Sequence, residues 1–218
     1  MKILVLSCDK NKDLFPLFYH CIEKYWPNHP EIIYSTETIN NPFYKTICKN
    51  YPLNKWTKRI RECVEEIEDK HVLILCDDLF IRKPVIKDVE HLCNYLHDDI
   101  ASINLEKSFD SKDIPINGFL MMRNPQGKYK NSCLCSLWNR DRLLDILAID
   151  ASPWEMEQLN DGKDFVYLIL KDYFIEWEDP DTHWRWGLVR KGQWKKEAKT
   201  FFDAEGVDID YSIRGFIK

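Results

Sequence analysis

The feature that most constrains the fold of this chain is a run of buried-strand sequence that ends in two adjacent carboxylates. Residues 71–76 (HVLILC) are almost entirely apolar, and Asp77 and Asp78 follow at once. Unbroken aliphatic runs of this length are typical of a parallel strand covered on both faces. Open α/β sheets bind their ligands just beyond the carboxyl ends of such strands. The run therefore predicts both a fold class and the place of a site.

The first 105 residues alternate between strand-like and helix-like patterns. In the helix-like stretches, apolar residues recur three and four positions apart, which indicates one buried face. The alternation predicts a doubly wound, mostly parallel α/β sheet flanked by helices. We expect strands at 2–7, 31–35, 71–76 and 100–105, helices at 13–25, from 56 to about 67 and around 89–96, and irregular structure over 36–52.

The second half of the chain, residues 106–218, is less regular and predicts a mixed arrangement. Asn139 is placed to cap a helix that runs to about residue 149, and Ser152 followed by Pro153 begins another. No linker or repeat divides the chain, so we expect one domain over 1–218, with 1–105 as its first half. Strand patterns occur at 118–123 and 132–138, and residues 165–170 are apolar without a clear period.

Composition excludes several function classes. The net charge of −5 gives no reason to expect nucleic acid as a partner. The chain has neither GxGxxG nor GxxxxGK[ST], which argues against dinucleotide enzymes and P-loop NTPases. Eight cysteines occur without a Cys-x-x-Cys motif, a signal-peptide pattern or a run of transmembrane length. We therefore expect reduced thiols and a cytoplasmic protein.

The tandem carboxylates Asp77 and Asp78 predict a cation. A single aspartate after a strand commonly serves only as a turn or cap residue. Two in tandem between apolar residues repel each other, and each needs compensation. Carboxylate oxygens suit Mn²⁺ or Mg²⁺, which bind through one or two carboxylates together with substrate phosphates.

Three segments give the chain a family resemblance. The first strand ends in Ser7-Cys8-Asp9, a helix begins at Trp56 (WTKRIRECVEEI), and residues 75–78 read Leu-Cys-Asp-Asp. In this order they resemble the nucleotide-sugar-binding half of the GT-A class of glycosyltransferases. That half has a Rossmann-type sheet, and its "DxD" metal motif lies at the position of residues 75–78. Here Cys76 stands where the first aspartate would be. Residues 152–157 and 192–194 are similar to segments in the second halves of small bacterial glycosyltransferases that build surface polysaccharides.

The resemblance implies a metal-dependent glycosyltransferase. Its donor would be a nucleotide-diphosphate sugar, with a UDP-sugar favoured, and its acceptor a carbohydrate or a lipid-linked molecule. Asp78 and Asp77 would hold the metal. We expect Ser7, Asp9 and Arg59 to contribute to donor binding, although Asp9 also suits an ordinary turn and Arg59 suits a solvated helix face, which we favour for it.

Glu155 and Glu157 are the candidates for the catalytic base. An inverting transferase needs a carboxylate to deprotonate the acceptor hydroxyl. Ser152 and Glu155 form an S-x-x-E capping box, which gives Glu155 a structural reason to be there. We therefore favour Glu157 by a narrow margin. Trp154 beside them suits stacking on an acceptor sugar or plain packing.

Residues 183–196 form a basic and aromatic stretch in an otherwise acidic chain. The resemblance suggests His183 as a metal ligand, although a lone loop histidine more often has no such role. Trp184 is a candidate for acceptor binding. Lysine and arginine here suit stabilisation of the leaving diphosphate. The same composition suits a membrane interface, which would place the protein peripherally on the inner face of the membrane.

Two other functions remain open. A nucleotidyltransferase can share this fold and also needs metal carboxylates, but it usually has a glycine-rich basic loop after its first strand. Residues 7–12 (SCDKNK) contain no glycine. The other alternative is a non-catalytic protein that binds carbohydrate or membrane through its tryptophan-rich segment.

Overall fold

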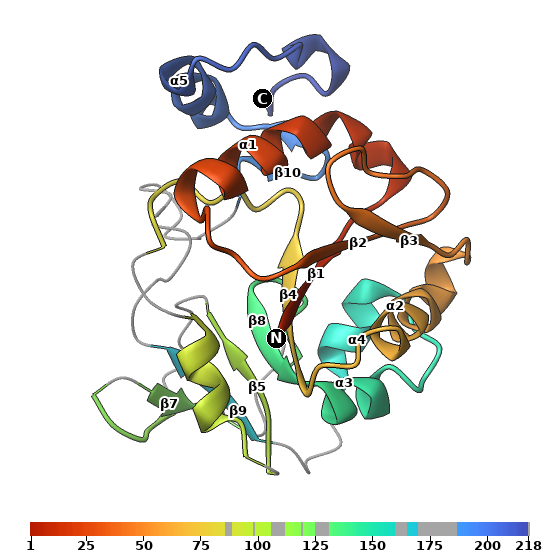
Figure 1. The fold of residues 1–218 in the computed structure, drawn as a ribbon, viewed down its shortest axis with the longest axis vertical. Helices are drawn as coiled ribbons and strands as arrows, with labels where there is room; N and C mark the ends of the chain where they lie inside the picture. The colour runs from red at the N-terminus through yellow and green to blue at the C-terminus, as the bar shows by residue number, and fades with distance from the viewer. Residues whose placement is uncertain are drawn as a thin grey trace.

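The computed structural model has a mixed β-sheet at its centre with helices on both faces (Figure 1). Within the described part of the chain, nine strands form this sheet in the order β3-β2-β1-β4-β8-β5-β9-β7-β6. The described residues are 1–85, 89–97, 99–105, 112–118, 120–124, 131–159, 165–169 and 187–217. The strands of the sheet are β1 (Lys2–Leu6), β2 (Ile32–Thr36), β3 (Lys45–Cys48), β4 (His71–Cys76), β5 (Ile100–Asn104), β6 (Ile114–Pro115), β7 (Leu120–Met122), β8 (Ser136–Asn139) and β9 (Phe165–Ile169).

Strand β1 shows why the sheet is covered on both faces. Ile3 and Val5 point into one core with α1, α5 and the segment that precedes β5, whereas Leu4 and Leu6 point into a second core with α2, α3 and α4. All four are buried, as expected of a central parallel strand. The helices are α1 (Phe15–Tyr25), α2 (Trp56–Glu65), α3 (Arg140–Ile146), α4 (Pro153–Gln158) and α5 (Lys196–Glu205), with 3₁₀ turns at Asp9–Leu14, Leu53–Lys55, Val89–Tyr95 and Tyr211–Ile213.

The predicted α/β class is confirmed, and the strand order adds two features that the sequence did not predict. The irregular stretch 36–52 contains a short parallel edge strand, β3, in which only Ile47 is buried. Strand β8 lies antiparallel between β4 and β5, so the four strands β3-β2-β1-β4 are parallel but the sheet as a whole is mixed. The helix expected around 89–96 is a 3₁₀ helix.

The last described segment, residues 187–217, packs on the same face of the sheet as α1 (Figure 1). A small hairpin of β10 (Val189–Arg190) and β11 (Gln193–Trp194) precedes α5. Trp194 is fully buried and its indole lies against Phe80, Phe202 and Tyr211. This aromatic cluster fixes the C-terminal segment close to the end of β4.

A polar cluster adds a second attachment between α5 and α1. The carboxylate of Glu205 accepts hydrogen bonds from Lys24 at 2.7 Å and Tyr25 at 2.5 Å, and lies 2.9 Å from His20 Nε2. Burial opposes the charge of Glu205, but these partners prevail and lower its pKa to about 2. Among the described helices, none is long and apolar enough to cross a bilayer.

Candidate active site at the ends of strands β1 and β4

The two aspartates lie beside the end of β1, as the sequence predicts for a site at the strand ends. Strands β1 and β4 pair in parallel, with Leu6 opposite Cys76, and the amide of Asp77 donates to the carbonyl of Leu6 at 3.4 Å. Asp77 is buried, with 1% of its surface exposed, and Asp78 is partly exposed. The pair therefore has one inner and one outer carboxylate.

The inner carboxylate is held by two side chains from the first strand and its loop. The hydroxyl of Ser7 donates to Asp77 Oδ2, and the amide nitrogen of Asn11 donates to Asp77 Oδ1 at 2.8 Å. Within the described residues, by contrast, no other side chain donates a hydrogen bond to Asp78. The carboxylate oxygens of Asp78 are therefore more accessible to a ligand, whereas Ser7 and Asn11 fix the orientation of the buried Asp77 carboxylate.

The electrostatics of the pair favour a cation. Burial raises the pKa of Asp77 to about 8, and the neighbouring charge of Asp78 adds to this effect. Burial also raises the pKa of Asp78, to about 6. The guanidinium of Arg214 opposes both shifts without removing them. Two neighbouring carboxylates whose charged forms are disfavoured by burial are suited to a divalent cation, which would supply the missing positive charge.

Asp9 organises the loop after β2. Its carboxylate accepts hydrogen bonds from the amide of Thr38 at 3.0 Å, the hydroxyl of Thr38 at 2.5 Å and the amide of Ile39 at 3.1 Å. Burial opposes the charge, but these hydrogen bonds lower the pKa of Asp9. In this structure Asp9 therefore joins the loops that follow β1 and β2.

Arg59 is buried, so its interpretation as a solvated helix residue is wrong. Only 3% of its surface is exposed, and its guanidinium pairs with Glu37 and donates to the carbonyl of Ser7 at 2.9 Å. Glu37 in turn accepts from the amide of Asp9 at 2.6 Å. Arg59 thus connects α2 to the ends of β1 and β2 beside the aspartates.

The two glutamates of α4 have different environments. Glu155 forms the predicted capping box with Ser152: its carboxylate accepts from the Ser152 amide at 2.8 Å, and the Ser152 hydroxyl accepts from the Glu155 amide at 3.4 Å. Glu157 is partly buried and accepts from the amide of Cys133 at 3.3 Å. Burial raises the pKa of Glu157, which the amide of Cys133 and the charge of Arg123 only partly oppose. Trp154, on the same helix, is 65% exposed.

Cys133 links Glu157 to Cys76, the residue before the two aspartates. Its amide donates to Glu157, while its carbonyl accepts from the thiol of Cys76 at 3.2 Å. Cys76 directly precedes Asp77 in the chain. A single residue of the segment before β8 therefore separates the candidate base from the metal motif.

The chain at Gly187 closes over the backbone of Asp78. A Cβ atom at this position would lie 2.3 Å from the carbonyl oxygen of Asp78 and 2.9 Å from the Leu79 side chain. Only glycine allows this approach. His183 and Trp184, four and three residues earlier, lie outside the described residues. Within the described part of the chain, no three His, Cys, Asp or Glu side chains form a group suited to a metal ion.

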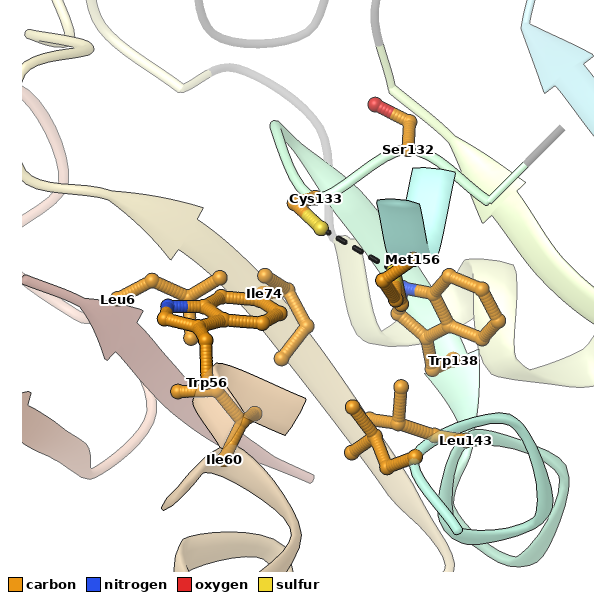
Figure 2. A pocket seen from close by; sticks show the side chains of 10 residues that line it. Leu6, Trp56, Ile60, Ile74, Ser132, Cys133, Trp138, Leu143 and Met156 are labelled. Carbon is orange, nitrogen blue, oxygen red and sulfur yellow. Dashed lines mark hydrogen bonds between the residues drawn. The ribbon is translucent and has the colours of Figure 1, made fainter. Parts of the chain in front are cut away.

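An apolar hollow lies on the other side of Cys133, between the sheet and helices α2, α3 and α4. Figure 2 shows Trp56 and Trp138 on opposite sides of it. The thiol of Cys133 contacts the sulfur of Met156 at 3.3 Å. No charged side chain lines it, so it does not suit a diphosphate. The lining residues are Leu6, Trp56, Ile60, Ile74, Ser132, Cys133, Trp138, Leu143, Leu147 and Met156.

No protein-family model and no curated protein matches the sequence. Among solved structures, the galactosyltransferase LgtC in complex with donor and acceptor sugar analogs is 14% identical, with a TM-score of 0.48 over 77% of this chain and 73% of that chain. The bifunctional glycosyltransferase WbbM is 8% identical, with a TM-score of 0.45 over 75% of this chain and 37% of that chain. CMP:2-keto-3-deoxy-manno-octonic acid synthetase complexed with CTP is 17% identical, with a TM-score of 0.48 over 76% of this chain and 87% of that chain. These three structures include both glycosyl and nucleotidyl transferases, and their TM-scores all lie below 0.5.

Proposed function

We propose that this protein transfers a sugar from a nucleotide-diphosphate donor, a UDP-sugar by preference, to a carbohydrate or lipid-linked acceptor in bacterial surface polysaccharide synthesis. One observation carries the proposal: a buried and a partly exposed carboxylate, without a direct ion pair from the described residues, follow the parallel strand β4, and Cys133 links the partly buried Glu157 to Cys76 just before them. Sugar transfer from a nucleoside diphosphate needs a cation for the diphosphate and a base for the acceptor, and this arrangement offers both.

Asp78 is the proposed principal ligand of Mn²⁺ or Mg²⁺, with Asp77 behind it. Two carboxylates suffice because Mg²⁺ usually keeps several waters and takes its remaining ligands from substrate phosphates. Such a cation, when bound, neutralises the negative charge that develops on the leaving diphosphate. His183 remains a proposed further ligand.

Glu157 is the proposed base. Burial raises the pKa of Glu157 towards neutral pH, and a base whose pKa is closer to the working pH accepts a proton from a hydroxyl more efficiently. The acceptor oxygen forms a bond to the anomeric carbon, its proton passes to Glu157, and the bond from that carbon to the diphosphate oxygen breaks. The capping box occupies Glu155, which makes it the second candidate for the same role.

The remaining proposed roles concern binding. Ser7 holds Asp77, while Asp9 and Arg59 join the loops that border the donor site, so we propose that they shape this site. Trp154 exposes its ring beside Glu157 and is the proposed acceptor contact, together with Trp184. A lipid-linked acceptor would bring the protein to the inner face of the membrane.

Thermal unfolding with UDP and Mn²⁺ tests the donor site. The wild-type protein should gain stability with both present, and Asp78→Asn should abolish the gain. Asp203→Asn is a matched control, because Asp203 lies exposed on α5 and pairs with Lys199 at 2.9 Å. The control should keep the gain. If no nucleoside diphosphate with either metal stabilises the wild type, the proposal is wrong.

Turnover tests the base and separates sugar transfer from nucleotidyl transfer. Glu157→Gln should lose about 100-fold or more in turnover while UDP and Mn²⁺ still bind. Glu155→Gln should keep turnover and lose only the stability of its cap. Release of pyrophosphate from CTP or UTP, without hydrolysis of any nucleotide sugar, would indicate a nucleotidyltransferase instead.

A further inference from the structure

Arg214, near the end of the described chain, is buried against the loop that follows β1. Only 7% of its side chain is exposed. Its Nε and Nη2 atoms donate to the two carboxylate oxygens of Asp13 at 2.7 and 2.6 Å, which is the bidentate geometry that a guanidinium supplies and an ammonium does not. The C-terminal segment thus has a rigid charged anchor beside the candidate site.

Asn11 links Arg214 to Asp77. Arg214 Nη2 also donates to the side-chain oxygen of Asn11 at 3.0 Å and to the carbonyl of Lys10 at 3.1 Å. The nitrogen of the same amide donates to Asp77 at 2.8 Å. The three groups form a chain of hydrogen bonds that runs from the C-terminal segment to the inner carboxylate.

The chemistry of the three groups fixes which of them donates and which accepts in each hydrogen bond of this series. A guanidinium can only donate, so it requires the oxygen of the Asn11 amide to face it. The amide nitrogen then faces Asp77, whose Oδ1 accepts its hydrogen bond. Without Arg214, the amide loses the donor that fixes its oxygen, and its orientation then depends on Asp77 alone. The same guanidinium also favours the charged forms of Asp77 and Asp78.

We propose that Arg214 is a positioning residue, which acts through the Asn11 amide to orient Asp77 beside the metal that Asp78 would hold on the diphosphate. This inference rests on the proposed function. Other contacts of the C-terminal segment, such as the Glu205 cluster and the buried Trp194, attach it to the fold without touching Asn11. A role in attachment alone can therefore be separated from a role in orientation.

Binding of Mn²⁺, measured from the loss of its free electron paramagnetic resonance signal in the presence of UDP, tests the inference. Asn11→Ala and Arg214→Gln should each weaken Mn²⁺ binding by about 10- to 100-fold, as is usual when a partner of a metal ligand is removed. The double variant should be no weaker than the weaker single variant, because both changes break one chain of contacts. Arg214→Lys should restore little of the Mn²⁺ affinity, since an ammonium group cannot make the bidentate contact of a guanidinium.

Lys24→Met is the matched control. It removes another ion pair that attaches the C-terminal segment, between α1 and Glu205, and should lower stability without changing the affinity for Mn²⁺. The inference is wrong if Asn11→Ala binds Mn²⁺ like the wild type, if the two single effects add, or if Lys24→Met weakens Mn²⁺ binding as much as Arg214→Gln does.

A measurement without metal separates this inference from the proposed function. The side-chain amide resonances of Asn11, observed by ¹⁵N nuclear magnetic resonance, should shift in Arg214→Gln and stay in place in Lys24→Met. Unchanged resonances in Arg214→Gln would refute the orienting role. Absence of Mn²⁺ and UDP binding by the wild type, with the resonance shift present, would refute the proposed function and leave the orienting contact standing.

Discussion

Replacement of Gly187 by alanine is the sharpest test of how the C-terminal segment meets the aspartates. The added Cβ would lie 2.3 Å from the carbonyl oxygen of Asp78 and 2.9 Å from a methyl carbon of Leu79. The leucine methyl can rotate away, but the carbonyl belongs to the backbone. It would have to retreat by about 1 Å to reach an ordinary contact distance. The backbone that carries the metal motif would therefore have to move.

The cost of this movement can be estimated. Overpacking a closely packed site costs about 1–3 kcal/mol, and a clash with backbone belongs at the upper end. At roughly 2–4 °C per kcal/mol for a chain of this size, the melting temperature of Gly187→Ala should fall by about 6–12 °C. Because Asp78 is displaced, the stabilisation by UDP and Mn²⁺ should shrink as well.

Gly118→Ala is the control, because a Cβ at Gly118 would meet no atom within 4 Å. Neither Gly118 nor Gly187 has a positive φ, so the backbone conformation disfavours alanine at neither position. Gly118→Ala should be neutral or stabilising by up to about 1 kcal/mol, since alanine reduces the entropy of the unfolded chain. Urea unfolding of both variants gives the comparison. Equal stability of the two would show that the chain at 187 does not press on Asp78 as described.

Three further outcomes are expected. Because the pKa of Asp77 is raised to about 8, the native state holds a proton that the unfolded state releases. The unfolding free energy of the metal-free protein should therefore fall as pH rises from about 4 to 8. Asp77→Asn should flatten this slope in urea titrations. Because the pKa of Glu205 is lowered to about 2, its contribution to the unfolding free energy is present above the unfolded value near 4.5 and lost as pH falls towards 2. Glu205→Gln should therefore cost about 2 kcal/mol at pH 7 and far less at pH 2.5 in the same urea titrations. An equal cost at both pH values would contradict the lowered pKa. Trp154→Ala should change stability by less than about 0.5 kcal/mol while it raises the KM for acceptor, and an unchanged KM would remove Trp154 from the acceptor site.

Features encoded in a few neighbouring residues could be predicted from the sequence. The strand at 71–76, its position before two carboxylates and the Ser152–Glu155 capping box all depend on local pattern, and the structure contains each of them. Strand order and direction depend on which segments meet in space. The pattern at 132–138 therefore predicted a strand, but not its antiparallel place between β4 and β5.

The partners of the aspartates could not be predicted from the sequence for the same reason. Asn11 is an unremarkable loop residue and Arg214 an isolated cation 136 positions from Asp78, so neither carries a sequence signal. Arg59 did carry one. It lies three residues after Trp56 and four before Cys63, on the buried stripe of α2, and this spacing indicates burial rather than a solvated face.

The position of β8 has a consequence for how the chain folds. Strand β4 ends at Cys76 and its second neighbour begins at Ser136, so a loop of roughly 60 residues must close before that edge is paired. Such non-local pairing slows folding, and until it occurs β4 presents a row of unpaired backbone groups to other molecules. The strand that ends in the aspartates therefore also has an unpaired edge in a nascent or heat-stressed chain, at which aggregation can begin. Conditions that speed the docking of β8, rather than those that stabilise the first four strands, should decide the yield of refolded protein.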